Sequence, residues 1–131
     1  MATVALTADT FESSILEPTS DSGIVLVDFW AGWCGPCLAF APIYDAASED
    51  NADITFAKVD TEAEPALSQA LDIRSIPTLM IFRDGIGVFS QAGALPRPVL
   101  DDLIGQVRAL DMDDVRAQIA QQQAPADDDT R

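Results

Sequence analysis

The chain has 131 residues, of which 48% are hydrophobic, and this is enough for one compact domain with a core of its own. Its 22 acidic and 7 basic residues give a net charge of −15. Nucleic-acid binding is therefore not expected, because phosphate contacts require clustered lysine and arginine. No apolar run approaches the ~20 residues needed to cross a bilayer, so no membrane partner is expected either.

The first half of the chain alternates short apolar segments with helical patterns. Residues 4–6 are a short strand candidate, and Thr7 is placed to cap a helix that follows it. The segment 24–30 is β-branched and almost continuously apolar, which is typical of a central strand covered on both faces. A helix is then expected over about 34–47, with a proline in its first turn, and a second buried strand over 54–59.

The second half carries a short helix, a hairpin and a longer helix. The short helix is expected over 65–71 and the first strand of the hairpin over 79–82. Asp84-Gly85 is a hairpin-turn signal that leads into a strand over 86–90. The final helix of this part, 98–110, is amphipathic, and its expected apolar face consists of Val99, Leu103, Ile104, Val107 and Leu110.

These elements define a fold class and two regions. The order β-α-β-α-β-α-β-β-α predicts an α/β fold, in which a central five-stranded mixed sheet is flanked by helices on both faces. We expect residues 1–110 to form this domain and residues 111–131 to be a C-terminal extension. In the extension, a short helix is expected over 113–122, followed by a disordered acidic tail that includes Asp127-Asp128-Asp129.

Both cysteines of the chain lie in the segment Trp33-Cys34-Gly35-Pro36-Cys37. Residues i and i+3 on the first turn of a helix satisfy the Cα separation of a disulfide, about 4.4–6.8 Å, and a helix N-terminus favours the reactive thiolate. The pair is interpreted as a redox site, half of a metal site, or two core residues. A zinc site normally takes four ligands, and this chain has no histidine, so no metal is expected.

The spacing predicts a division of labour between the two thiols. Cys34 is expected at the helix N-cap, exposed, where it attacks a target disulfide. Cys37 lies one turn inside the helix, is expected to be more buried, and resolves the mixed disulfide. With no visible export signal the expected location is the cytoplasm, where such a pair is more often catalytic or metal-binding than structural.

Asp28 is the one charged residue in the apolar strand 24–30. Burial should raise its pKa, and a carboxyl that titrates near neutral pH beside a buried thiol can act as that thiol's base. The alternative is a polar residue satisfied by a neighbour. Lys58, the one lysine, lies on the neighbouring predicted strand, where it either approaches Asp28 or extends along the surface to solvent.

A second segment is predicted to lie beside the cysteines. Pro77 cannot donate to a sheet, so Ile76-Pro77 marks a strand start or a special turn, and from spacing alone a trans bond is the better expectation. Trp33, Gly35, Pro36, Ile76, Pro77, Gly93 and Ala94 are expected to form a small apolar patch around Cys34, and such patches often mark binding sites. Trp30 is interpreted as a core residue or as a shield of the site.

The sequence closely resembles the thioredoxin family. The resemblance covers roughly residues 3–110 and is carried by 25–31, by the Cys34-Gly35-Pro36-Cys37 motif, and by the segments 57–60, 73–78 and 93–95. It implies the thioredoxin fold, with Cys34 as nucleophile, Cys37 as resolving thiol and Asp28 as the buried acid. Lys58, with Gly35 and Pro36, would tune the pKa values of the site. It also implies a cis bond before Pro77, which reverses the expectation from spacing.

The activity implied by the resemblance is reduction of protein disulfides by a monomer that binds no cofactor. Electrons would come from NADPH through thioredoxin reductase, which carries its own flavin. Leu38 departs from the family pattern, because a basic residue is common after the second cysteine. A disulfide isomerase or oxidant is the second interpretation, but Gly35-Pro36 is less typical of those families. A redox-independent binding or co-chaperone subunit is the third.

Overall fold

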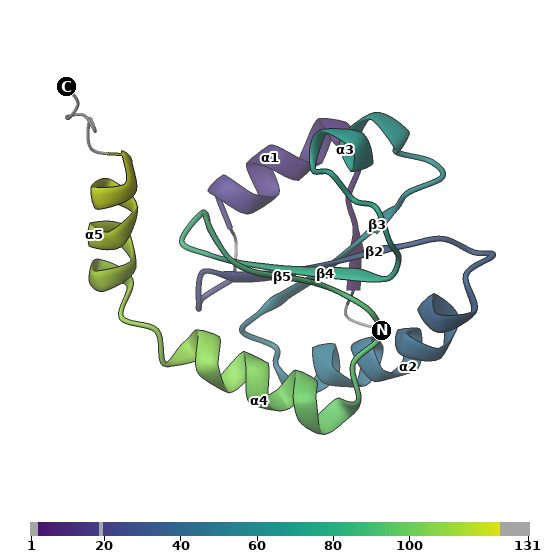
Figure 1. The fold of residues 1–131 in the computed structure, drawn as a ribbon. Helices are drawn as coiled ribbons and strands as arrows, with labels where there is room; N and C mark the ends of the chain where they lie inside the picture. Colours follow the sequence, from purple (N-terminus) through teal and green to yellow (C-terminus); the bar gives the residue numbers. More distant parts are fainter. Residues whose placement is uncertain (1–2, 19, 124–131) are drawn as a thin grey trace.

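The computed structural model describes residues 3–18 and 20–123, and in these residues a single sheet lies between helices (Figure 1). Its strands are β1 (Thr3–Ala5), β2 (Ile24–Trp30), β3 (Thr55–Asp60), β4 (Thr78–Arg83) and β5 (Ile86–Ala92). Its helices are α1 (Ala8–Leu16), α2 (Gly35–Asp50), α3 (Pro65–Ala70), α4 (Arg97–Arg108) and α5 (Met112–Gln123). The order predicted for the elements from β1 to α4 is confirmed.

The five strands form one mixed sheet in the order β1-β3-β2-β4-β5. β1 and β2 pair with β3 in parallel, whereas β4 is antiparallel to both β2 and β5. β2 is therefore the central strand, which agrees with its continuous apolar sequence. The register places Asp28 of β2 between Lys58 of β3 and Leu79 of β4.

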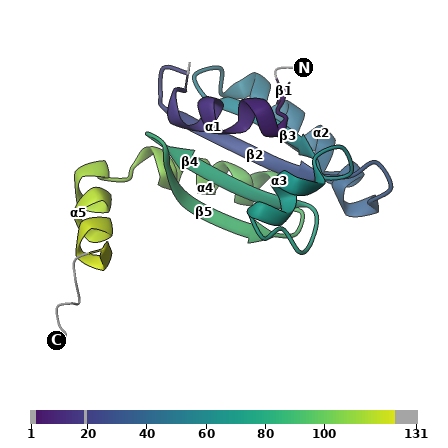
Figure 2. The same cartoon turned by 90° about the horizontal axis from the view of Figure 1, so that it is seen from above.

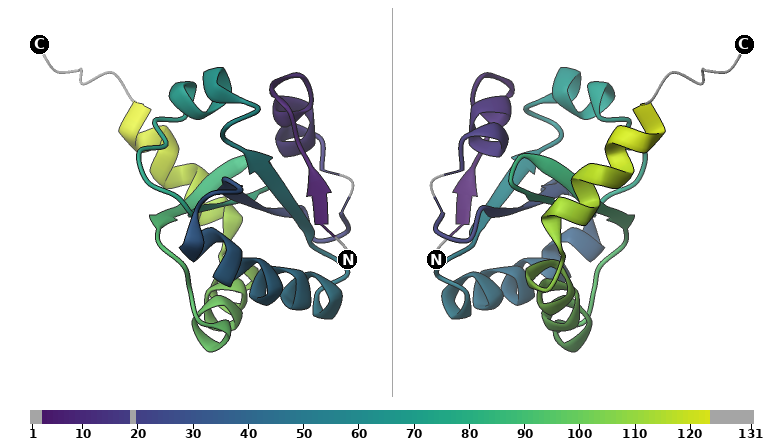
Figure 3. Two further views of the ribbon diagram at one scale, coloured as in Figure 1. Left: turned by 90° about the vertical axis from the view of Figure 1, so that its right-hand side faces the viewer. Right: turned by 90° about the vertical axis from the view of Figure 1, so that its left-hand side faces the viewer.

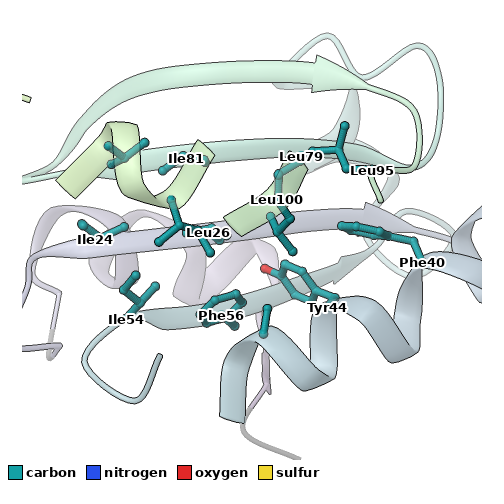
Figure 4. Packing of buried hydrophobic residues seen from close by; sticks show 13 residues of the cluster. Ile24, Leu26, Phe40, Tyr44, Ile54, Phe56, Leu79, Ile81, Leu95 and Leu100 are labelled. Carbon is teal, nitrogen blue, oxygen red and sulfur yellow. The ribbon is translucent and has the colours of Figure 1, made fainter. Parts of the chain in front are cut away.

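Helices cover both faces of the sheet, as predicted: α1 and α3 lie on one face, and α2 and α4 on the other (Figures 1 and 2). Because side chains alternate along a strand, β2 supplies both cores. Val25, Val27 and Phe29 pack with Phe11 and Ile15 of α1. The opposite core contains Ile24, Leu26, Phe40, Tyr44, Ala47, Ile54, Phe56, Leu79, Ile81, Leu95, Leu100, Ile104 and Val107 (Figure 4).

The apolar face predicted for the last helix of the domain is partly wrong. Val99 is 48% exposed, whereas Leu100, which the prediction omitted, is completely buried. The buried residues of α4 are Leu100, Ile104 and Val107, at spacings of four and three residues. Two adjacent apolar residues fit a helical pattern almost equally well, and packing against the sheet and α2 decides between them.

Two aspartates adopt the left-handed conformation that their local sequence favours. Asp84 and Gly85 have φ values of 54° and 81° in the hairpin turn between β4 and β5, as the Asp-Gly signal predicts. Asp72 has a φ of 58° after α3. Aspartate tolerates this region better than most residues.

The C-terminal part of the described chain lies at one end of the sheet (Figure 3). The Arg83 guanidinium donates to the carbonyl oxygens of Val107, Arg108 and Leu110 at 2.9, 3.3 and 2.9 Å, and so satisfies the C-terminal end of α4. α5 then spans Met112–Gln123, where a helix over 113–122 is predicted. The expected disordered segment Asp127-Asp128-Asp129 lies outside the described residues.

Candidate functional site

The two cysteines lie where the central strand passes into α2, at the end of the sheet that faces the viewer in the left panel of Figure 3. β2 ends at Trp30, and Cys34 is the N-cap of α2. Pro36 occupies the first turn of the helix, where its missing N–H costs no hydrogen bond. Cys34 and Cys37 are joined by a disulfide, with their Cα atoms 5.2 Å apart, as the spacing predicts.

The helix start directs a backbone donor at the first sulfur. The Cys37 N–H donates to Cys34 Sγ at 3.2 Å, and the same sulfur lies 3.7 Å from the carbonyl oxygen of Ile76. The expectation that Cys34 is exposed is wrong for the disulfide form, because Cys34 is 4% exposed and Cys37 is 2% exposed. Both pack with buried Ala31, and the side chains of Trp30 and Ile76 cover this cluster.

Asp28 is buried at the centre of the sheet, with 1% of its surface exposed. Among the described residues neither carboxylate oxygen has a hydrogen-bond partner. Burial raises the pKa of Asp28 from 3.8 to about 7, and the positive charge of Lys58 partly opposes that increase. The raised pKa predicted from the apolar neighbours of Asp28 is thus confirmed.

Lys58 lies beside Asp28 in the register of β2 and β3, but it also contacts the ring of Trp30. Its Nζ is 4.9 Å from the ring centroid, within the range of a cation–π interaction. A cavity of about 310 Å³ opens next to this pair and is lined by Thr3, Ala5, Leu6, Thr7, Asp60, Ala63 and Glu64 as well. The Lys58 side chain is half-buried, so it is neither fully enclosed with Asp28 nor free in solvent.

The Ile76-Pro77 segment lies against the cysteines, and its peptide bond is cis. The trans bond expected from spacing alone is therefore wrong, and the cis bond implied by the resemblance is confirmed. The Pro77 carbonyl accepts a hydrogen bond of 2.7 Å from the N–H of Gly93, so the segments 76–77 and 93–94 are joined. Ala94 follows in an exposed position.

The apolar residues predicted around Cys34 differ in exposure. Trp33 is 70% exposed, Gly35, Pro36, Gly93 and Ala94 are exposed, Ile76 is half-buried and Pro77 is buried. The structure brings Ile76 to the Cys34 sulfur and Gly93 to Pro77. Trp33 lies next to Cys34 because it directly precedes it in the sequence.

Tyr44 is a residue of this region that the sequence interpretation missed. Its hydroxyl is buried and donates to the Ala57 carbonyl at 2.7 Å. Burial, and then the nearby charge of Asp28, raises the pKa of the phenol well above its ordinary value. The spacing of Cys37, Phe40 and Tyr44, at i, i+3 and i+7, could have indicated that Tyr44 shares a helix face with the resolving thiol.

The described residues contain no group of three or more histidine, cysteine, aspartate or glutamate side chains that could hold a metal ion. Within the same residues, no helix is both long enough and apolar enough to span a membrane. The chemistry visible at the site is that of a disulfide that can open to two thiols, with a titratable carboxyl nearby.

Comparisons with known proteins agree with this geometry. The thioredoxin family model matches residues 2–106. A protein described as putative thioredoxin 2 from Streptomyces coelicolor is 54% identical over 125 residues, covering 95% of this chain and 90% of that protein. Thioredoxin 1 of Synechococcus elongatus is 44% identical over 97 residues, 73% of this chain and 88% of its own length. The chain therefore belongs to the thioredoxin family and is a dithiol–disulfide oxidoreductase.

Proposed function

We propose that the protein reduces disulfides in other proteins, with Cys34 as the attacking thiol and Cys37 as the resolving thiol. The observation that carries this assignment is the hydrogen bond from the Cys37 N–H to Cys34 Sγ at the N-cap of α2. A donor aimed at the sulfur, together with the positive end of the helix dipole, favours the thiolate of Cys34. Cys37 lies one turn inside the helix and not at its N-cap.

The reaction transfers two electrons from the dithiol to the target. The Cys34 thiolate attacks one sulfur of the target disulfide, a mixed disulfide forms, and the other target sulfur leaves as a thiolate. Cys37, once deprotonated, attacks Cys34 Sγ. The bond between Cys34 and the target breaks, the second target thiolate leaves, and the Cys34–Cys37 disulfide remains.

Asp28 is the proposed acceptor for the Cys37 proton, directly or through water. A general base is most effective when its pKa lies near the working pH, and the pKa of Asp28 is raised to about 7. Its two oxygens accept no hydrogen bond from the described residues, so they are available to take a proton. Lys58, Gly35 and Pro36 are proposed to tune the pKa values of the site.

The partner is proposed to bind over Trp33, Ile76, Pro77, Gly93 and Ala94. The hydrogen bond between Gly93 and Pro77 and the approach of Ile76 to Cys34 Sγ support a continuous surface around the attacked bond. An extended segment of a target could pair with exposed backbone there, as in other cases of strand addition.

We also propose an electron donor, the part of the chain that suffices for activity, and a compartment. Electrons would come from NADPH through thioredoxin reductase, with no cofactor bound to this chain, and residues 1–110 would suffice for activity as a monomer. A reducing compartment such as the cytoplasm is proposed, because both cysteines belong to the redox pair and the fold has no further cysteine to require oxidation.

Reduction of insulin disulfides tests the assignment of the two thiols. With NADPH and thioredoxin reductase, the native protein should turn over, and both Cys34→Ser and Cys37→Ser should be inactive. In a single-turnover reaction started with dithiothreitol-reduced protein, Cys37→Ser should accumulate a mixed disulfide with insulin that mass spectrometry detects, and Cys34→Ser should not. Dithiothreitol in place of the reductase separates failed reductase recognition from failed thiol chemistry. Activity that survives Cys34→Ser would refute the catalytic role.

A further inference from the structure

We infer that Leu38 is a specificity-determining residue, which extends the partner-binding surface along α2 and selects target disulfides that carry an apolar side chain beside the attacked cysteine. The inference rests on the proposed function, because it concerns the partner that meets Cys34. It does not follow from the family pattern, in which a basic residue is common at this position.

The segment that contains the start of α2 carries no charged side chain, although the chain as a whole is strongly acidic. Residues 31–44 contain no charged side chain, in a protein with 22 acidic and 7 basic residues. The charged residues nearest in sequence are Asp28, which is buried, and Asp45, which is half-buried. The exposed members of the segment are Gly32, Trp33, Gly35, Pro36, Leu38, Ala39 and Pro42.

Trp33 and Leu38 lie on either side of the redox pair in the sequence, at the beginning of the helix. With Cys34 as N-cap, Trp33 precedes the cap and Leu38 is the fourth helical residue, and side chains at these two positions commonly pack together. Both nevertheless remain open to solvent, with 70% of Trp33 and 54% of Leu38 exposed. Three other large hydrophobic residues are exposed among the described residues, and none of them belongs to this turn: Val4, Leu16 and Val99.

A target of this protein meets that segment during the reaction. Cys34 is the N-cap of α2, so when its thiolate attacks a target sulfur, the residues that flank this sulfur come against the start of α2. An apolar flanking side chain gains burial there. A charged one loses hydration and finds no partner in the segment 31–44, which disfavours it.

Peptide disulfides that differ only at the residue beside the attacked cysteine test this inference. Leucine, glutamine, glutamate and lysine at that residue give four matched substrates. The native protein should reduce the leucine peptide with a kcat/KM about five-fold above that for the glutamine peptide, mainly through a lower KM. The glutamate peptide should be the poorest substrate, because the net charge of the protein is −15.

Two variants locate the preference at Leu38. Leu38→Gln removes the apolar side chain without adding charge and should bring the leucine-to-glutamine ratio close to one. Leu38→Lys should improve the glutamate peptide relative to the lysine peptide. Leu16→Gln is the matched control, because Leu16 is also exposed, at 57%, but its side chain lies beside Gly85 in the hairpin turn. It should keep the native preference.

A measurement of the redox potential completes the design. The redox potential of Leu38→Gln, measured in equilibrium with glutathione, should equal that of the native protein. Equal potentials would show that the substitution changes partner contact and not thiol chemistry. Equal kcat/KM values of the native protein for the leucine and glutamine peptides, or an unchanged ratio in Leu38→Gln, would overturn the inference. If no peptide were reduced at all, the proposed function would fail instead.

Discussion

Asp28 is expected to destabilise the fold when its carboxyl group is ionised. Its carboxyl group is 1% exposed at the centre of the sheet, and neither oxygen accepts a hydrogen bond from the described residues. Burial of an ionised group without full compensation is unfavourable, and the nearby Lys58 offsets only part of that cost. A residue that destabilises its own fold is typical of a functional site.

The raised pKa of Asp28 predicts how stability depends on pH. The folded-state pKa of about 7 is above the ordinary value of 3.8, so between these values the folded protein holds a proton that the unfolded chain releases. Stability therefore falls as the pH rises through this range, by roughly 4 kcal/mol at most. Asp28→Asn should be more stable than the native protein at pH 8, and the gap should shrink toward pH 4.5.

Urea unfolding of the two oxidised proteins at both pH values measures this difference. Groups that titrate elsewhere in the chain affect both proteins alike, so the native-minus-variant comparison isolates Asp28. A stability difference that is the same at pH 4.5 and pH 8 would show that Asp28 is not the group that titrates.

Single residues also show what the sequence could predict. The apolar neighbours of Asp28 were sufficient to predict its raised pKa. The isomer of Ile76-Pro77 was not predictable from spacing, because cis and trans prolyl bonds differ by only about 0.5–1 kcal/mol and tertiary contacts decide between them. The burial of Cys34 depends on Ile76, 42 residues away, which no local pattern brings next to it.

At the scale of elements, the spacing of apolar residues and the turn-forming residues predicted the helices and strands, but they did not predict which face of a helix is buried. In α4 the sequence offers Val99 and Leu100 side by side, and each continues to Val107 at helical spacing, Val99 through Leu103 and Leu100 through Ile104. β2 gave no such ambiguity, because both of its faces are buried: Ile24 to Phe29 are all buried, and Trp30 at the strand end is half-buried.

A matched pair of substitutions tests the buried face of α4. Leu100→Ala removes a completely buried side chain and should lower the free energy of unfolding by about 2–5 kcal/mol. Val99→Ala removes one that is 48% exposed and should change it by no more than about 0.5 kcal/mol. Urea titrations of both variants measure the difference, and equal losses would mean that the face assigned to α4 is wrong.

At the scale of the whole molecule, the redox pair and α5 lie at opposite ends of the sheet (Figures 1 and 3). The Arg83 guanidinium ties the end of α4 to the sheet, and Arg116 of α5 reaches Asp84 of the hairpin turn at 3.3 Å. The alignment with the Streptomyces coelicolor protein covers 95% of this chain. An alignment that left out all 12 residues of α5 could not cover so much of the chain. The similarity to that protein therefore extends into the residues of α5, although the thioredoxin family model ends its match at residue 106.

Removal of α5 should separate stability from activity. A chain that ends at Leu110 keeps the three carbonyl groups that Arg83 contacts, but it loses Met112, which is 7% exposed, together with half-buried Val115 and Ile119. Burial of Met112 alone corresponds to about 2 kcal/mol of unfolding free energy. Met112→Ala in the full chain should reproduce most of the loss measured by urea unfolding.

Because the cysteines lie at the other end of the sheet, kcat/KM for insulin at 25 °C should stay within about two-fold of the native value in both the truncated chain and Met112→Ala. A larger fall in the truncated chain, with Met112→Ala unaffected, would mean that α5 contributes to the reaction or to partner binding, and not only to the stability of the domain.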